Sequence, residues 1–185
     1  MEGIEGAKRQ ALIVALIEEM SKRRSWCGET HIQKAVYCLQ RGLRIPTGFR
    51  FVFYKYGPFS FDLRQEIGQM RANGLIEVDQ QPYPYGPTLV LSASAEKLKH
   101  SFPKTIARFN SQLQFIAEKC APLDASQLER LSAALYVIDE ELPDESVEAR
   151  AKRLTDLKPH VNPEEAKAAV EEVQGMLAEA SALGV

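Results

Sequence analysis

The residue types that most often perform catalysis or bind metals are sparse in this chain and are not grouped by spacing. The histidines lack the His-x3-His spacing that places two imidazoles on one helix face, and the cysteines form no Cys-x2-Cys pair. These residues are His31, His100, His160, Cys27, Cys38 and Cys120. Neither a Gly-x-Ser-x-Gly elbow nor a phosphate-loop motif occurs. The sequence therefore predicts a non-enzymatic protein without metal or cofactor and with buried free thiols. A hydrolase site assembled from distant residues stays an alternative.

A helix predicted over residues 61–73 carries polar side chains that suit binding. Leu63, Ile67 and Met70 recur on its inner face, and Ser60 is a good N-cap. The outer face then presents Arg64, Gln65, Gln69 and Arg71. Because Arg and Gln side chains make bidentate contacts with guanine and adenine edges, this face suits the reading of DNA. A mixed-charge surface that binds a protein is the alternative.

Neighbouring charges leave the choice between DNA and protein open. Lys34 and Arg41 lie on the preceding predicted helix and are expected to reach phosphates if DNA is the partner. Asp62 and Glu66 are expected on or beside the outer face of helix 61–73, where they would repel a phosphate backbone. The sequence thus supports both kinds of partner.

A proline-rich loop between two predicted strands supplies further candidate contacts. Strands are predicted at 75–78 and 89–91, and the loop between them holds Tyr83 and Tyr85 among prolines. Exposed aromatic side chains in a rigid frame are typical interface anchors, although packing over the core is the alternative. A strand, a loop and a strand directly after a short helix form the arrangement of a wing.

The segment before residue 95 follows the order of a winged helix-turn-helix unit. The predicted elements are helices at 4–24, 30–42 and 61–73 and strands at 51–54, 75–78 and 89–91. Thr30 and Gln33 have the spacing of a capping box at the start of the second helix. Gly57 and Pro58 are expected to form a turn after the aromatic strand.

Everything after residue 95 is predicted to be helical. The expected helices cover 103–120, 126–141 and 145–157, and a last helix begins at Asn162 with Pro163 at its first position. The predicted fold class is therefore mainly α (α+β): a winged helix-turn-helix with a small β-hairpin wing, followed by a C-terminal helical bundle. We expect residues 1–95 to form the winged-helix module and residues 96–185 to pack on it as one compact unit.

Composition and charge describe an ordinary globular protein. The chain has 185 residues, of which 45% are apolar and 26% are charged. Its longest apolar run, 11–17, is far shorter than the roughly 20 residues of a membrane span, and the N-terminus lacks a secretory-signal pattern. A cytoplasmic protein without membrane contact is expected. Residues 1–110 carry a net charge of +6 and residues 111–185 carry −8, which indicates either a nucleic-acid face in the first half or chance.

Several segments resemble those of a known family. Residues 32–37 read Ile-Gln-Lys-Ala-Val-Tyr, residues 56–60 read Tyr-Gly-Pro-Phe-Ser, and residues 74–76 read Gly-Leu-Ile. Together with residues 131–136 and 157–160, they resemble the Panacea-type antitoxin domain and related bacterial winged-helix proteins. The Tyr-Gly-Pro-x-Ser motif is the most specific element. The resemblance implies a winged-helix fold and a cytoplasmic, non-enzymatic antitoxin that neutralises a toxin by direct contact.

These observations lead to two functional hypotheses. The first is an antitoxin-like interaction protein of bacterial or phage type that masks a partner protein through helix 61–73 and the Tyr83–Tyr85 loop. The second is a sequence-specific DNA-binding regulator that reads bases through the same helix. A homodimer through the Leu-rich faces of the C-terminal helices is an alternative to packing of those faces within one chain.

Overall fold

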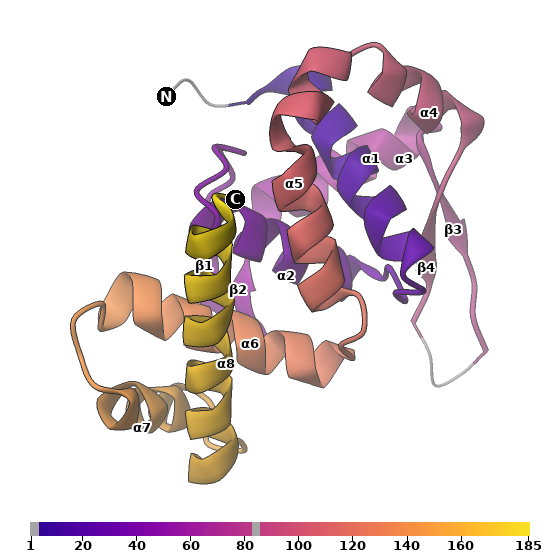
Figure 1. Cartoon of the computed structure of the whole chain (residues 1–185). Coiled ribbons are helices and arrows are strands. Elements are labelled where there is room, and N and C mark those ends of the chain that lie inside the picture. Colours follow the sequence, from indigo (N-terminus) through magenta and orange to yellow (C-terminus); the bar gives the residue numbers. More distant parts are fainter. Residues whose placement is uncertain (1–3, 83–85) are drawn as a thin grey trace.

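The computed structural model describes residues 4–82 and 86–185 of the chain, which are mainly helical and include two small antiparallel hairpins (Figure 1). The mainly α class predicted from the sequence is therefore confirmed. Tyr83 and Tyr85, the predicted anchors of the loop, lie outside the described residues.

The first two helices supply the centre of the core. Helix α1 (Gly6–Lys22) buries the whole apolar run 11–17, and helix α2 (Glu29–Tyr37) continues into a π-helical turn, η1 (Cys38–Gly42). The predicted Thr30–Gln33 capping box is wrong. Gly28 is the N-cap of α2, without a side-chain cap, because Gln33 is buried and bonds to a distant part of the chain.

The aromatic strand belongs to a hairpin that was not predicted. Strand β1 (Val52–Tyr54) pairs antiparallel with β2 (Gly57–Phe59), and Val52 lies opposite Phe59. The expected turn at Gly57-Pro58 is therefore wrong, since these residues begin β2 and residues 55–56 connect the strands. Gly57 has a φ of +88°, a conformation that glycine adopts without a Cβ penalty.

Helix α3 (Phe61–Ala72) follows directly, and its predicted N-cap is confirmed. The Ser60 hydroxyl accepts from the Leu63 backbone N–H at 3.2 Å. After Gly74, whose φ is +68°, the chain enters β3 (Ile76–Asp79), which pairs antiparallel with β4 (Thr88–Leu91). The predicted strands at 75–78 and 89–91 are thus present, with small shifts of their ends.

The rest of the described chain is helical, as predicted. The elements are α4 (Ala93–His100), α5 (Pro103–Cys120), α6 (Ala125–Tyr136) with the π-helical turn η2 (Val137–Glu141), α7 (Val147–Leu157) and α8 (Pro163–Leu183). Asn162 begins α8 with a capping box to Glu165, which confirms that predicted start. Helix α4 was not expected as a separate element.

One hydrophobic core joins the two predicted halves of the chain. Helix α1 packs along α5, α2 packs on α6, and α8 crosses α6 and packs on α7 (Figure 1). Cys27, Cys38 and Cys120 are free and buried, as predicted. Among the described residues, no helix combines the length and apolar character needed to cross a membrane.

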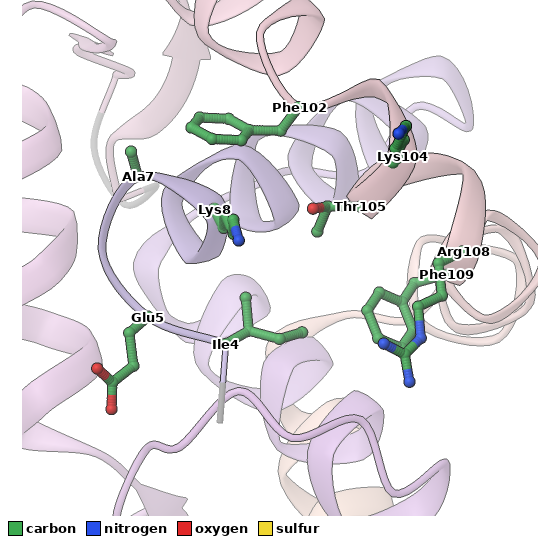
Figure 2. Close-up of a pocket in the computed structure, with 9 residues that line it drawn as sticks. All are labelled: Ile4, Glu5, Ala7, Lys8, Phe102, Lys104, Thr105, Arg108 and Phe109. Atoms are coloured by element: carbon green, nitrogen blue, oxygen red, sulfur yellow. The ribbon is translucent and has the colours of Figure 1, made fainter. Parts of the chain in front are cut away.

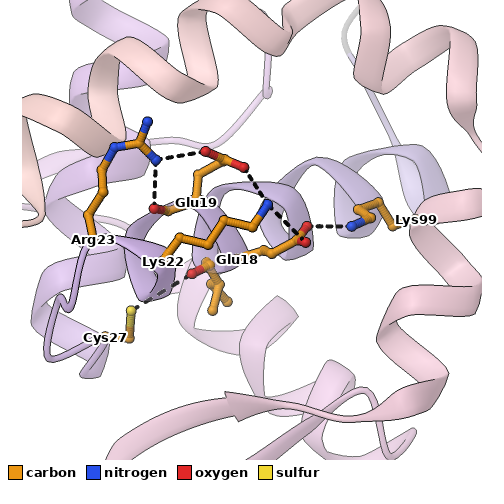
Figure 3. Close-up of polar contacts among 7 residues, drawn as sticks. Glu18, Glu19, Lys22, Arg23, Cys27 and Lys99 are labelled. Atoms are coloured by element: carbon orange, nitrogen blue, oxygen red, sulfur yellow. Dashed lines mark hydrogen bonds and ion pairs between the residues drawn. The ribbon is translucent and has the colours of Figure 1, made fainter.

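Polar contacts on the surface of α1 add a link to α4 (Figure 3). Glu18 pairs with Lys99 of α4 and with Lys22 of its own helix, the latter at 3.1 Å. Glu19 pairs with Lys22 at 2.8 Å and with Arg23 at 2.7 Å. Because partly exposed ion pairs each contribute little, we assign this network a positioning role between α1 and α4.

Candidate functional site

The hairpin β1–β2 and the start of α3 present a group of exposed apolar side chains, which we call the aromatic surface. Its members are Val52, Tyr54, Tyr56 and Phe61, with the half-buried Phe59 between them. Tyr54, Tyr56 and Phe61 are each 54–55% exposed. Isolated apolar residues on a surface need no explanation, but a group of exposed aromatic side chains of this kind is a candidate interaction site.

The rings of the aromatic surface contact one another. The Phe61 ring lies 5.1 Å from the Phe59 ring and 5.7 Å from the Tyr54 ring, measured between centroids, and both pairs are edge-to-face. Such pairs contribute about 0.5–1.5 kcal/mol beyond the area they bury. The rings of Tyr54, Phe59 and Phe61 therefore support one another's positions.

Successive side chains of β1 point to opposite faces of the hairpin, and this decides which of them are exposed. Val52 and Tyr54 point to one side, whereas Phe53 points to the other and packs on Tyr136 of α6 at 4.9 Å between ring centroids. The strand thus uses one apolar face for packing and leaves the second apolar face exposed.

Two buried side chains of α2 hold the hairpin and the start of α3. Gln33 donates from Nε2 to the Ser60 carbonyl at 2.9 Å and accepts at Oε1 from the Ser60 N–H at 3.0 Å. The Lys34 ammonium donates to the Pro58 carbonyl at 2.8 Å. These bonds connect the Ile-Gln-Lys segment to the Tyr-Gly-Pro-Phe-Ser segment, 24 and 27 residues away.

The surroundings of Lys34 are unusual for a lysine. Burial lowers the pKa of its ammonium to about 8, although the nearby Glu129 carboxylate opposes this shift. Glu129 is also the partner of the buried Lys158, at 3.3 Å. The Glu129 carboxylate thus pairs with one buried ammonium group and acts electrostatically on a second.

A groove of about 500 Å³ adjoins the aromatic surface. Its lining residues are Gln40, Arg41, Phe49, Arg50, Phe51, Val52, Phe61, Asp62 and Glu140. Two of the lining side chains have polar partners behind them: Arg41 contacts Asp139 at 2.7 Å, and Glu140 accepts from the Tyr37 hydroxyl at 3.1 Å. The π-helical turns η1 and η2 meet here, and such turns are frequent at functional sites.

The predicted binding residues of α3 lie on its surface. Arg64, Gln65, Gln69 and Arg71 are all exposed, and Arg64 pairs with Glu29 at 3.5 Å. Asp62 is also exposed, 3.7 Å from Arg50. The expected position of Glu66 is wrong, because this residue is buried and binds Arg9 and Gln10 of α1. One of the two expected repulsive carboxylates is therefore absent from the outer face.

The cations predicted on α2 and its extension are engaged inside the molecule. The exposed fraction of Lys34 is 2%, so the expected contact of its ammonium with phosphate is not compatible with this structure. Arg41 is only one-third exposed and is paired with Asp139 and Glu140. Both residues hold the fold around the aromatic surface rather than extending from it.

The buried thiols Cys27 and Cys120 are poorly suited to nucleophilic chemistry. Burial raises the pKa of the Cys27 thiol and lowers the pKa of His31. A hydrogen bond to Cys38, together with burial, raises the pKa of the Cys120 thiol well above its ordinary value. Within the described residues, no group of three His, Cys, Asp or Glu side chains is placed to hold a metal ion.

Comparison with known proteins adds no relative: no protein-family model matches this chain, and no curated protein matches it. The aromatic surface was missed by sequence reasoning, since residues 51–54 are all apolar or aromatic and their pattern does not say which face is covered.

Proposed function

We propose that this chain is a non-enzymatic interaction protein, antitoxin-like in type, that masks a partner protein by direct contact. The observation that carries the proposal is the aromatic surface beside α3. Its exposed Tyr and Phe side chains adjoin a groove; both residue types are enriched in protein interfaces, and Tyr is among the residues that dominate binding energy there. The exposed polar face of α3 would then form the rim of the contact.

The architecture before residue 95 supports a winged-helix relationship as part of the same proposal. Helix α3 follows α2 in the chain, is capped by Ser60, and leads straight into the hairpin β3–β4. In this assignment α3 is the recognition helix and β3–β4 is the wing. The hairpin β1–β2 between α2 and α3 is an addition to that arrangement, and it carries most of the aromatic surface.

Co-expression with a neighbouring reading frame tests the proposal. We expect an adjacent frame to encode a toxic protein whose lethality this chain relieves and with which it co-elutes as a complex. The double variant Tyr54→Ser/Phe61→Ser should lose both properties. Leu183→Ser, which changes an exposed apolar residue at the end of α8, is the matched control and should retain them. A harmless neighbour, or full protection by the double variant, would overturn the proposal.

DNA binding is the second candidate, and one observation favours it. The outer face of α3 presents Arg64, Gln65, Gln69 and Arg71. Because Glu66 is buried, Asp62 is the only exposed carboxylate within α3. A regulator should bind duplex DNA at low ionic strength and lose affinity steeply as salt rises, through counterion release. Arg64→Glu/Arg71→Glu should abolish this binding. If no salt-sensitive binding is found, the DNA hypothesis fails.

A further inference from the structure

The geometry points to a second site, separate from the aromatic surface, that binds a small anion carrying an aromatic ring, such as a nucleoside phosphate. The site is a pocket of about 650 Å³ between the start of α1 and the start of α5 (Figure 2). Its volume lies within the range of about 300–1,000 Å³ that is typical of small-molecule sites. Nothing in the proposed masking function requires this pocket.

The lining combines cations with apolar walls. Among the described lining residues, Lys8, Lys104 and Arg108 carry positive charge and Glu5 carries the one negative charge. In Figure 2 the Glu5 carboxylate extends away from the other labelled side chains, whereas the Lys8 amine lies between Ile4 and Thr105. Neither Lys8 nor Lys104 has an ion-pair partner among the residues that the structure describes.

Two phenylalanines give the pocket its preference for a ring. Phe102 is half-buried and Phe109 is buried, and both line the space together with Ile4. The Arg108 guanidinium lies 5.1 Å from the centre of the Phe109 ring. A planar group could pack against Phe102 while its charged end meets the lysines, because aromatic rings pack on other rings and ammonium groups bind phosphate oxygens.

Both lysines lie near a helix N-terminus, where the helix dipole disfavours positive charge. Lys8 and Lys104 occupy the first turns of α1 and α5, and neither first turn contains an acidic residue or a side-chain cap. Lys8 and Lys104 line the same pocket, so each helix start and its lysine contribute positive potential to it, although Glu5 is the N-cap of α1. A bound anion would be stabilised by both, with Thr105 as a further hydrogen-bonding group.

Calorimetric titration with ATP, adenosine and inorganic tripolyphosphate tests this site. We expect ATP to bind at least about tenfold more tightly than either of the other two, because each lacks one half of the recognised group. Phe102→Ala should weaken ATP binding and leave tripolyphosphate binding unchanged. Tripolyphosphate binding as tightly as ATP, or no ATP binding at millimolar concentration, would overturn the inference.

Charge reversal provides a second arm with its own control. Lys8→Glu/Lys104→Glu should lower the affinity for ATP at least tenfold, whereas Lys152→Glu/Lys167→Glu, with the same change of net charge on α7 and α8, should not. Since acidic residues favour helix N-termini, the first variant is expected to keep its thermal stability, which separates lost binding from unfolding. If both variants lost the same affinity for ATP, the loss would follow from the change in net charge, and the proposed site would be contradicted.

Discussion

The Gln33 side chain bonds to both backbone groups of Ser60, as donor at 2.9 Å and as acceptor at 3.0 Å. Ser60 is the N-cap of α3 and is fully buried, so α2 fixes the point at which α3 begins. The first residue of α3, Phe61, belongs to the aromatic surface. The position of that surface thus depends on a contact made from inside the core.

Replacement of Gln33 by leucine should therefore be costly. The change keeps the apolar packing of the site but leaves the buried Ser60 N–H without a partner, at about 1–3 kcal/mol, while the Ser60 C=O keeps only its bond from the Arg64 N–H. We expect the free energy of unfolding, measured with urea, to fall by about 1–3 kcal/mol. Gln65→Leu on the exposed face of α3 is the control and should change it by less than about 0.5 kcal/mol. Equal effects of the two changes would contradict the assigned role.

Two glycines near α3 should respond to alanine in opposite directions. At Gly57 a Cβ would have ordinary contacts, 3.6 Å from the Glu129 carbonyl oxygen, so the cost arises from the φ of +88°. We expect Gly57→Ala to destabilise the fold by about 1–3 kcal/mol. Gly68 lies within α3 with open space around it, and Gly68→Ala should stabilise the fold by about 0.5–1 kcal/mol. Thermal melts of both variants measure these changes in stability. If Gly57→Ala stabilised the fold, the conformational cost assigned to this position would be contradicted.

Burial of Lys34 predicts an unusual dependence of stability on pH. Its pKa is about 8 in the folded chain and 10.5 when the side chain is in water. Between these values the unfolded chain binds more protons than the folded chain, so the free energy of unfolding should rise with pH. One such group contributes at most about 1.4 kcal/mol per pH unit.

Urea unfolding at pH 7.5, 8.5 and 9.5 measures this slope. Lys34→Met should remove the rise that Lys34 contributes, because the variant has no titrating group at this position. Lys55→Met, at an exposed site between β1 and β2, should keep the wild-type slope. Identical slopes in wild type and Lys34→Met would show that the lysine does not titrate in this range.

The elements that were predicted correctly are those with local signals. Asn162, Pro163 and the capping glutamate begin α8 within four residues, and Ser60 caps α3 within the same span. The heptad-like apolar spacing of α5 and α6 is local as well. Such elements form where the sequence itself supplies their hydrogen-bond partners and their buried face.

The elements that were missed depend on distant residues. Gly57 and Pro58 read as a turn, yet they begin a strand that pairs with β1, and Lys34, 24 residues away, donates to the Pro58 carbonyl. Helix α4 has only one buried apolar residue, Ala95, and so shows no apolar period. The aromatic surface was not predicted because both faces of β1 are apolar in sequence. Which face is exposed depends on the elements that pack against β1, and its own sequence does not give them.

A comparison of exposed and inward-facing rings separates a binding role from a packing role for the aromatic surface. Phe53 packs on Tyr136, so Phe53→Ala should lower the free energy of unfolding by about 2–4 kcal/mol. Tyr54→Ser/Phe61→Ser removes two rings that are more than half exposed, together with their contacts with one another and with Phe59, and we expect a loss of about 1–2 kcal/mol. Urea unfolding of both variants measures this difference. If the double variant were as destabilised as Phe53→Ala, the rings would serve folding, and their exposure would no longer support a surface kept for a partner.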